Sequence, residues 1–240
     1  MTNPTAAMLV IGDEILSGRT RDANMYHLAG QLTERGIDLK EVRVVSDDPD
    51  AIINAVRALA AAYTHVVTSG GIGPTHDDIT ADCIAAAFEV HIDVRDDARA
   101  ILQAHYDTQG LELNEARLRM ARIPDGATLI DNPISKAPGF TLQNVHVMAG
   151  VPSIFQAMVA SILPELSGGT PLLSETWPVN QGEGVIAAPL GALAAAFPQV
   201  SVGCYPFQKD GIYGANIVLR STDTDMLKQA LSQLKLTFPA

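Results

Sequence analysis

The segment at 68–80, Thr-Ser-Gly-Gly-Ile-Gly-Pro-Thr-His-Asp-Asp-Ile-Thr, restricts the fold of this chain more than any other segment. It joins a short apolar strand candidate to a helix candidate. Its glycines, Gly70, Gly71 and Gly73, remove side chains, so backbone N–H groups can approach a phosphate. The carboxylates of Asp77 and Asp78 follow near the start of the helix. The segment therefore indicates a βα unit with a nucleotide-like ligand at the end of its strand.

Strand and helix candidates alternate through most of the chain. Strands are expected at 6–11, 39–45, 65–68, 128–130, 140–142 and 145–148. Helices are expected after Asp22, after Asp48-Pro49, and at 80–88, 97–106, 114–121 and 153–163. The first helix places Met25, Leu28 and Leu32 on one apolar face, and Gly36 can end it. This alternation predicts a largely parallel sheet that helices cover on both faces.

Polar or glycine-rich segments follow four of these strands: Gly12-Asp13-Glu14, Asp47-Asp48, Gly70-Gly71 and Gly150-Val151-Pro152. Ligands in parallel sheets bind beyond the carboxyl ends of the strands. We therefore expect the four segments to meet at one edge of the sheet.

The clearest linker in the sequence is Ser167-Gly168-Gly169-Thr170-Pro171. We place a domain at 1–168 and a second, small α+β domain at 172–240. The pattern of the second domain is α-β-β-α, with helices at 184–197 and 225–234 and strands at 200–205 and 213–219. It contains no concentration of catalytic residue types.

Composition excludes several classes of protein. With 240 residues, 47% hydrophobic and 18% charged, the chain should fold, and its apolar runs are too interrupted to span a membrane. Two cysteines, Cys83 and Cys204, and no signal-peptide pattern predict a cytoplasmic protein with reduced thiols. A net charge of −11 without a Lys/Arg cluster argues against nucleic acid as a partner. A small anion can still bind to backbone N–H groups.

The acidic residues have two interpretations. Asp77 and Asp78 can cap the following helix, or they can hold a hard divalent cation between themselves and a phosphate. Asp13 and Glu14 can complete the oxygen shell of that cation or simply be solvated. His76 has no evident partner and is interpreted as solvent-facing. Lys136 either contacts a phosphate or is solvated.

Four ordered motifs carry a resemblance to a known family. They are the loop at 69–80, Gly12-Asp13-Glu14-Ile15-Leu16-Ser17-Gly18 with Asn24, the segment at 132–140, and Gly150-Val151-Pro152-Ser153. Together they resemble the molybdopterin-binding family that includes MogA, MoaB, gephyrin domains and the amino-terminal part of CinA, and they agree with the CinA branch. The region at 172–240 resembles the middle domain of CinA proteins. No segment resembles the carboxy-terminal deamidase domain of full-length CinA, so that activity is not expected.

The resemblance implies a three-layer α/β/α sandwich with a mostly parallel sheet of the MogA/MoaB type. Asp78 matches the family's essential aspartate, and Asp47, or Asp48 if the register slips by one, matches a second catalytic acid. From the carboxylates themselves, we expect Asp78, Asp77, Asp13 and Glu14 to be the metal ligands, with Mg²⁺, Mn²⁺ or Co²⁺ as the ion. The implied substrate-binding residues are Ser69, Gly70, Gly71, Gly73, Thr75, Asn24, Lys136, Gly150, Pro152 and Ser153. A nucleotide or molybdopterin is the implied small-molecule ligand, and a homo-oligomer is expected from the relatives.

Two functions follow from the resemblance. MogA-type members adenylylate molybdopterin, whereas CinA-type domains and the related domain of eukaryotic FAD synthase are linked to metal-dependent cleavage of ADP-ribose or FAD. Asp77 stands where MogA-type loops have arginine, and Ile72 stands where they have threonine. The change of charge favours a nucleotide pyrophosphatase. The alternative is a module that binds molybdopterin or a nucleotide without turnover.

Overall fold

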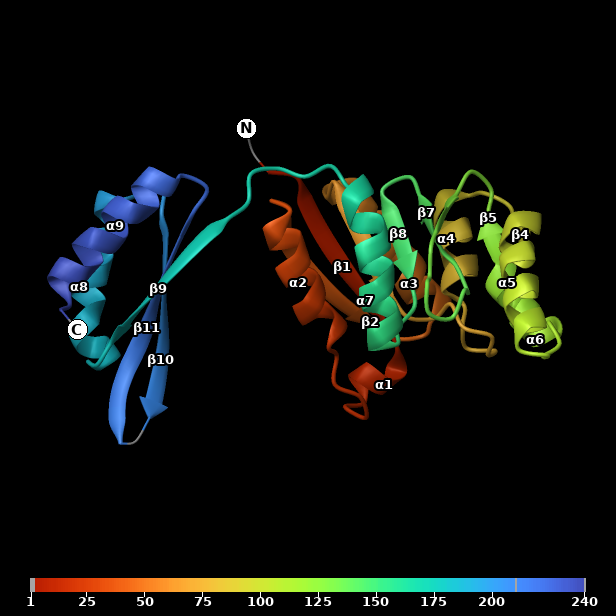
Figure 1. The fold of residues 1–240 in the computed structure, drawn as a ribbon, viewed down its shortest axis with the longest axis horizontal. Helices are drawn as coiled ribbons and strands as arrows, with labels where there is room; N and C mark the ends of the chain where they lie inside the picture. The colour runs from red at the N-terminus through yellow and green to blue at the C-terminus, as the bar shows by residue number, and fades with distance from the viewer. Residues whose placement is uncertain (1–2, 210, 240) are drawn as a thin grey trace. The chain divides into compact units, whose positions relative to one another are not determined.

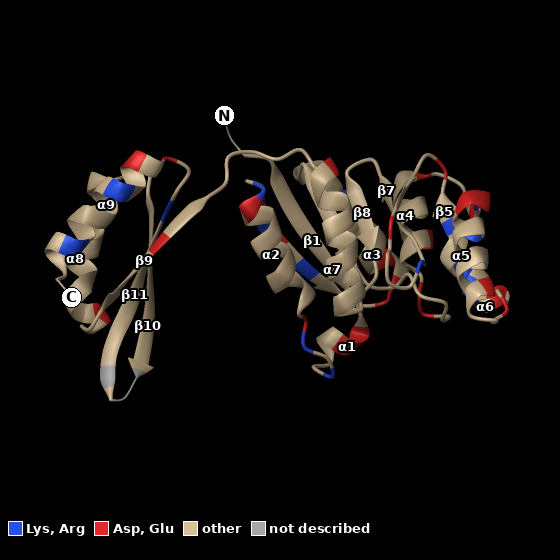
Figure 2. Cartoon of the chain, in the orientation of Figure 1, with Lys and Arg blue, Asp and Glu red and all other residues tan. Residues whose placement is uncertain are grey.

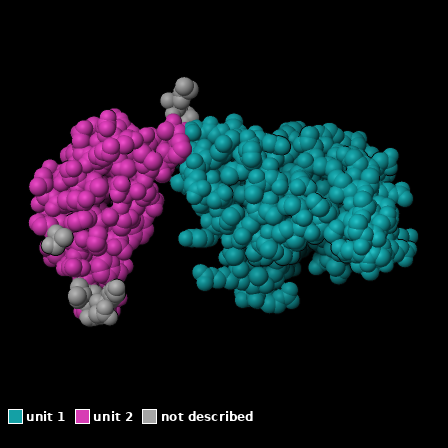
Figure 3. Space-filling model, in the orientation of Figure 1, with its two compact units in different colours: residues 1–169 teal, residues 170–240 magenta. Residues whose placement is uncertain are grey.

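The computed structural model describes residues 3–209 and 211–239. The chain divides into two compact units, Met1–Gly169 and Thr170–Ala240, shown in different colours in Figure 3. No helix in the described part of the chain has both the length and the apolar character needed to cross a bilayer.

A six-stranded mixed sheet with the order β2-β1-β3-β8-β7-β6 forms the centre of the first unit. Its strands are β1 (Thr5–Ile11), β2 (Asp38–Val45), β3 (His65–Ser69), β6 (Thr128–Ile130), β7 (Gly139–Leu142) and β8 (Val145–Met148). Strands β2, β1, β3 and β8 are parallel neighbours, whereas β7 and β6 pair antiparallel at one edge. The predicted fold class, with a mostly parallel sheet, is therefore confirmed.

Helices cover both faces of this sheet (Figure 1). Helices α2 (Asn24–Glu34) and α7 (Pro152–Ile162) pack on one face, and α3 (Pro49–Ala62), α4 (Thr80–Phe88) and α5 (Asp96–Thr108) contribute to the core on the other. Alternate residues of β1 enter the two cores: Leu9 lies in one and Met8 in the other. A strand buried on both faces needs a continuous apolar run, which is why the sequence of β1 does not alternate.

Aspartate side chains accept hydrogen bonds from first-turn N–H groups of α3 and α2. Asp48 is the N-cap of α3 and accepts a hydrogen bond of 2.9 Å from the Ala51 N–H, with Pro49 in the first turn. Asp22 accepts one from the Met25 N–H at 2.9 Å. Met25 itself is 41% exposed, and Asn24 takes the buried position that the sequence pattern assigned to Met25.

Several short elements were not predicted. They are α1 (Asp13–Leu16), β4 (Ile92–Val94) and β5 (Arg122–Pro124), the last two paired antiparallel. The predicted helix at 114–121 is two pieces, α6 (Glu115–Leu118) and the 3₁₀ turn η1 (Arg119–Ala121). A second 3₁₀ turn, η2 (Leu163–Glu165), follows α7. Elements of three or four residues are too short to show a hydrophobic period.

The second unit has a three-stranded antiparallel sheet with the order β10-β11-β9. Its elements are β9 (Leu173–Val179), α8 (Glu183–Ala196), β10 (Ser201–Lys209), β11 (Ile212–Ser221) and α9 (Thr224–Thr237). The predicted α-β-β-α pattern was wrong because it omitted β9. Most side chains of that strand are exposed and it contains Pro178, so its sequence lacks the apolar signal of a strand.

Candidate active site at the carboxyl ends of the strands

The glycine loop leaves β3 in a backbone conformation that requires glycine. Gly70 has φ 109° and Gly71 has φ 68°, both in the left-handed region that side chains disfavour. A Cβ atom on Gly70 would collide with the Ile11 carbonyl oxygen, and one on Gly71 would collide with the Thr80 hydroxyl. The two positions are therefore closed to other residues by conformation and by space.

Hydrogen bonds hold this loop in place. The Gly70 N–H donates to the Met148 carbonyl at 3.1 Å, and the Thr80 N–H donates to the Gly71 carbonyl at 2.9 Å. The Thr80 hydroxyl, which is buried, donates to the Gly70 carbonyl at 3.0 Å. Gly70 and Gly71 are thus tied to β8 on one side and to α4 on the other.

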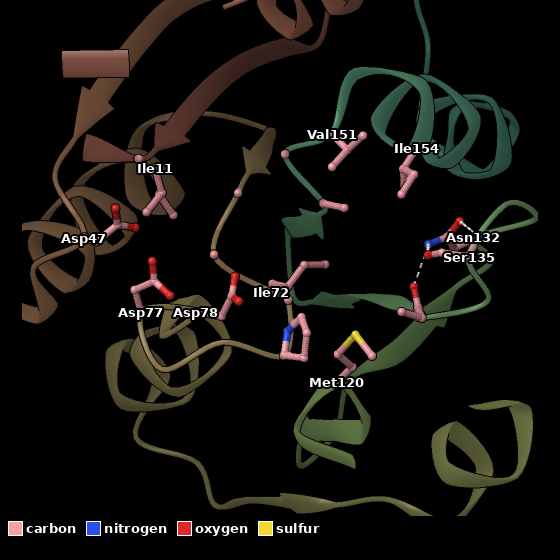
Figure 4. Close-up of a pocket in the computed structure, with 18 of the residues that line it drawn as sticks. Ile11, Asp47, Ile72, Asp77, Asp78, Met120, Asn132, Ser135, Val151 and Ile154 are labelled. Atoms are coloured by element: carbon pink, nitrogen blue, oxygen red, sulfur yellow. Dashed lines mark hydrogen bonds between the residues drawn. The ribbon is translucent and has the colours of Figure 1, made fainter. Parts of the chain in front are cut away.

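A cavity of about 410 Å³ opens above the loop (Figure 4). All four strand-end segments singled out in the sequence contribute to its wall. Its lining residues are Ile11, Gly12, Glu14, Asp47, Gly70, Gly71, Ile72, Gly73, Pro74, Asp77, Asp78, Met120, Asn132, Ser135, Ala137, Ala149, Gly150, Val151 and Ile154.

The cavity has two chemically different ends. Figure 4 shows the carboxylates of Asp47, Asp77 and Asp78 together on one side, and Asn132 with Ser135 on the opposite side. The apolar side chains of Ile72, Met120, Val151 and Ile154 lie between them. This arrangement suits a ligand with a metal-binding part and a flat apolar part.

Asp47 is fixed by the start of α1, whose first turn carries Asp13 and Glu14 (Figure 2). Its Oδ2 accepts a hydrogen bond of 2.9 Å from the Asp13 N–H. Burial raises the pKa of Asp47, and the charges of Asp13, Glu14 and Asp77 raise it further. Because Asp48 is used as a helix cap, Asp47 is the acid of this pair that faces the cavity.

Asp78 is oriented by its own loop. Its Oδ2 accepts hydrogen bonds from the Thr75 N–H at 2.8 Å and from the Thr75 hydroxyl at 2.5 Å. A Cβ on Gly73 would stand 2.6 Å from the same oxygen. The Arg119 guanidinium also donates to the Asp78 backbone carbonyl at 3.3 Å. Thr75 and Gly73 therefore set the position of the carboxylate.

The donor chemistry of the cavity suits a hard cation, but the site is not preformed. Four carboxylates line the wall, and none of the described lining residues is lysine or arginine. In the part of the chain that the structure describes, no three His, Cys, Asp or Glu side chains are grouped closely enough to hold a metal ion. Mg²⁺ commonly uses one or two carboxylates and completes its shell with water and substrate phosphates. The residues present therefore fit a metal that binds together with its substrate.

Seven residues expected at the ligand do not line this cavity. Asn24, Ser69 and Pro152 line a smaller pocket beside it. Asp13 and Thr75 act through hydrogen bonds to Asp47 and Asp78. Lys136 has φ 60° and lies 4.0 Å from the Asp131 carboxylate, and Ser153 is an exposed residue of α7. His76, with its side chain 99% exposed, is solvent-facing as expected.

The sequence did not predict the apolar wall of the cavity, nor the hydrogen bonds that support its Asn132 end. Met120 comes from η1 and carries no polar signal that could have marked it. Asn132 belongs to the motif at 132–140, yet its role was not specified. Its amide donates to the Ser135 hydroxyl at 2.7 Å and to the Ala137 carbonyl at 2.8 Å, which folds the loop against the cavity.

The fold and the cavity define an α/β domain that binds a small molecule at the carboxyl ends of parallel strands. Comparison with known proteins gives the family. The chain belongs to the family described as "Probable molybdopterin binding domain", whose model matches residues 7–168, and the model "FAD synthase, middle domain" matches residues 171–240.

Among solved structures, the chain is similar to the protein CinA with unknown function from Thermoplasma acidophilum. The identity is 32% and the TM-score 0.63, covering 69% of this chain and 99% of that one. A CinA-like protein of Citrifermentans bemidjiense is 32% identical over 95% of this chain, and a probable FAD synthase of Caenorhabditis elegans is 30% identical over 96% of it. The chain spans 57% and 49% of these two relatives, which is about half of their length.

Proposed function

We propose that the chain is a divalent-metal-dependent hydrolase that cleaves the pyrophosphate of an adenine dinucleotide such as ADP-ribose or FAD. The observation that carries this proposal is the set of four carboxylates around a bare glycine loop, with no basic residue among the described lining residues. Such a wall repels phosphate unless a cation lies between them. The match to a FAD synthase domain supports an adenine dinucleotide as the substrate class.

In the proposed reaction, water attacks one phosphorus atom, the bridging P–O bond breaks, and AMP leaves with ribose 5-phosphate or FMN as the second product. A bound divalent ion supplies Lewis acidity and neutralises phosphate charge. In this proposal Asp78, held by Thr75, would hold the ion, and Asp47 would accept the proton of the attacking water. The N–H groups of the glycine loop stabilise charge on the phosphate oxygens. The apolar wall holds the heterocycle.

Purified protein incubated with ADP-ribose or FAD and Mg²⁺, Mn²⁺ or Co²⁺ tests this proposal. We expect AMP release that depends on metal and falls in Asp78→Asn. Absence of AMP with every metal and both substrates would remove the proposal.

The alternative function is binding of molybdopterin or a nucleotide without turnover. Two observations favour it: no metal cluster is preformed among the described residues, and the middle of the cavity is apolar. A pterin ring fits such a wall without a metal. Titration of a pterin against the wild type and Asp78→Ala tests this reading, and lack of binding to either protein would exclude it.

A further inference from the structure

A small pocket lies beside the main cavity and shares Ile11, Glu14 and Gly150 with it. We call it the side pocket. Its volume is about 50 Å³, which is room for a few water-sized groups. It is lined by Val10, Ile11, Glu14, Ile15, Thr20, Arg21, Asp22, Ala23, Asn24, Ser69, Gly150 and Pro152. The Glu14 side chain folds back over Gly12 and borders both spaces.

Asn24, in the wall of the side pocket, has a buried acceptor without a partner. The residue is 3% exposed, and its Nδ2 donates to the Ser69 hydroxyl and to the Gly150 carbonyl, each at 2.7 Å. Because a carbonyl can only accept, these contacts fix the orientation of the amide. Its Oδ1 is then left with no hydrogen-bond partner among the described residues. Such a group is costly, so it indicates a missing water or ligand atom.

The chemistry of the side pocket matches a sugar hydroxyl. Asn24 Oδ1 can only accept, whereas the Arg21 guanidinium can only donate. The Ser69 hydroxyl accepts from Asn24 and therefore has its own hydrogen to donate. A hydroxyl group both donates and accepts, so it can pair with the Asn24 acceptor and with a donor of this lining. A two-ring heterocycle is far larger than the pocket, and an anion would face the unpaired oxygen of Asn24.

We propose that the side pocket binds a ribose hydroxyl of the nucleotide and that Asn24 Oδ1 accepts its hydrogen bond. This inference rests on the proposed nucleotide function, because it takes the ligand in the main cavity to be a nucleotide. Asn24 is then a specificity residue: it selects for a ligand that carries the hydroxyl at the point where the two spaces join.

Calorimetric titration in the presence of Mg²⁺ tests the inference separately from hydrolysis, because a nucleoside monophosphate has no pyrophosphate bond to cleave. The probes are AMP and three analogues. 2′-Deoxy-AMP and 3′-deoxy-AMP each lack one ribose hydroxyl, and IMP has an oxygen in place of the amine on the base. We expect the wild type to bind AMP about 10-fold more tightly than one of the deoxy analogues, and IMP as tightly as AMP. In Asn24→Ala the preference should disappear. Ser69→Ala, which removes one donor to the hydroxyl but keeps the Asn24 oxygen, should reduce the preference only in part.

Equal affinity of the wild type for AMP and both deoxy analogues would overturn the inference, and this result needs no variant. So would a loss of affinity with IMP alone, an Asn24→Ala protein that keeps the preference, or no detectable binding of AMP. If the protein hydrolyses ADP-ribose or FAD but binds AMP and both deoxy analogues equally, this inference fails and the proposed function stands. If the protein prefers the hydroxyl but hydrolyses neither substrate with any metal, the proposed function fails and this inference stands.

Discussion

The two ends of strands β3 and β8 differ in how their polar groups are satisfied. Near the carboxyl ends, Gly70 and Gly71 have positive φ, Asn24 has an unpaired oxygen, and Asp47 has a raised pKa. At the amino ends, His65 of β3 and His146 of β8 are buried and have partners on every ring nitrogen. The same strands are thus built for stability at one end and for a ligand at the other.

The histidine pair forms a chain of contacts. His146 Nδ1 lies 3.0 Å from the Thr141 hydroxyl, and its Nε2 lies 3.4 Å from His65 Nδ1. His65 Nε2 lies 3.0 Å from the Ser167 hydroxyl. Burial lowers the pKa of His146 to about 4, and the neighbouring His65 adds to this effect. Both rings are therefore neutral at pH 7, so this histidine pair carries no charge that needs a ligand.

Replacing Gly70 by alanine, at the carboxyl end of β3, should lower the free energy of unfolding more than any other substitution proposed. The new Cβ meets the Ile11 carbonyl at a positive φ, so we expect a loss of about 4 kcal/mol of unfolding free energy. Gly30→Ala is the matched control: Gly30 lies in helix α2 with open space around it, and alanine should stabilise by about 0.5–1 kcal/mol. Urea denaturation measures both. A Gly70→Ala protein as stable as the wild type would contradict the geometry described.

Acid should lower the free energy of unfolding through His146, at the amino end of the sheet. Because the folded pKa of His146 is below that of the unfolded chain, protons favour unfolding. Its contribution is present above about pH 6.5 and is lost as the pH falls toward 4, a change on the order of 3 kcal/mol. Urea denaturation of the wild type and His146→Gln between pH 7 and 4 measures the difference. Parallel stability curves for the two proteins would show that His146 does not titrate in this way.

Thr75 tests whether the orientation of Asp78 matters to the site. Thr75→Val keeps the size of the residue and the backbone N–H bond but removes the hydroxyl that donates to Asp78. We expect a loss of about 1–2 kcal/mol in kcat/KM for AMP release, since a hydrogen bond to a charged group is removed. Thr75→Ser retains the hydroxyl and should keep most of the activity. Equal rates for valine and serine would show that Asp78 is positioned by other contacts.

Asp47 should show the smallest effect on stability. A raised folded pKa means that ionisation opposes folding, so the penalty is absent at low pH and appears as the pH rises through the folded pKa. Asp47→Asn should therefore raise the free energy of unfolding at pH 7 in chelator by roughly 0.5 kcal/mol after solvent screening, which raises the melting temperature, and should have no effect near pH 3. Thermal melts at both pH values measure it. A lower melting temperature at pH 7 would contradict the repulsion among the acids.

The centre of the sheet could be predicted from the sequence because strands such as β1 (Thr5–Ile11) and β8 (Val145–Met148) are largely apolar runs between turn signals. The carboxyl-end segments could also be predicted to meet, since parallel strands bring their ends to one edge. Asp48 could be distinguished from Asp47 only in the structure, where the hydrogen bond to Ala51 identifies the cap. The apolar wall was not predictable, because Met120 reaches the cavity from a distant 3₁₀ turn through packing alone.

The most direct test of the account compares two neighbouring acids. Asp47→Asn and Asp48→Asn remove the same charge one residue apart, and asparagine is as good a helix cap as aspartate. With ADP-ribose or FAD and a saturating divalent metal, we predict that Asp47→Asn lowers kcat/KM for AMP release by about 10²–10³-fold. Asp48→Asn should stay within about 2-fold of the wild type, since its cap is preserved. Equal rates for the two variants would contradict the assignment of Asp47 to the site.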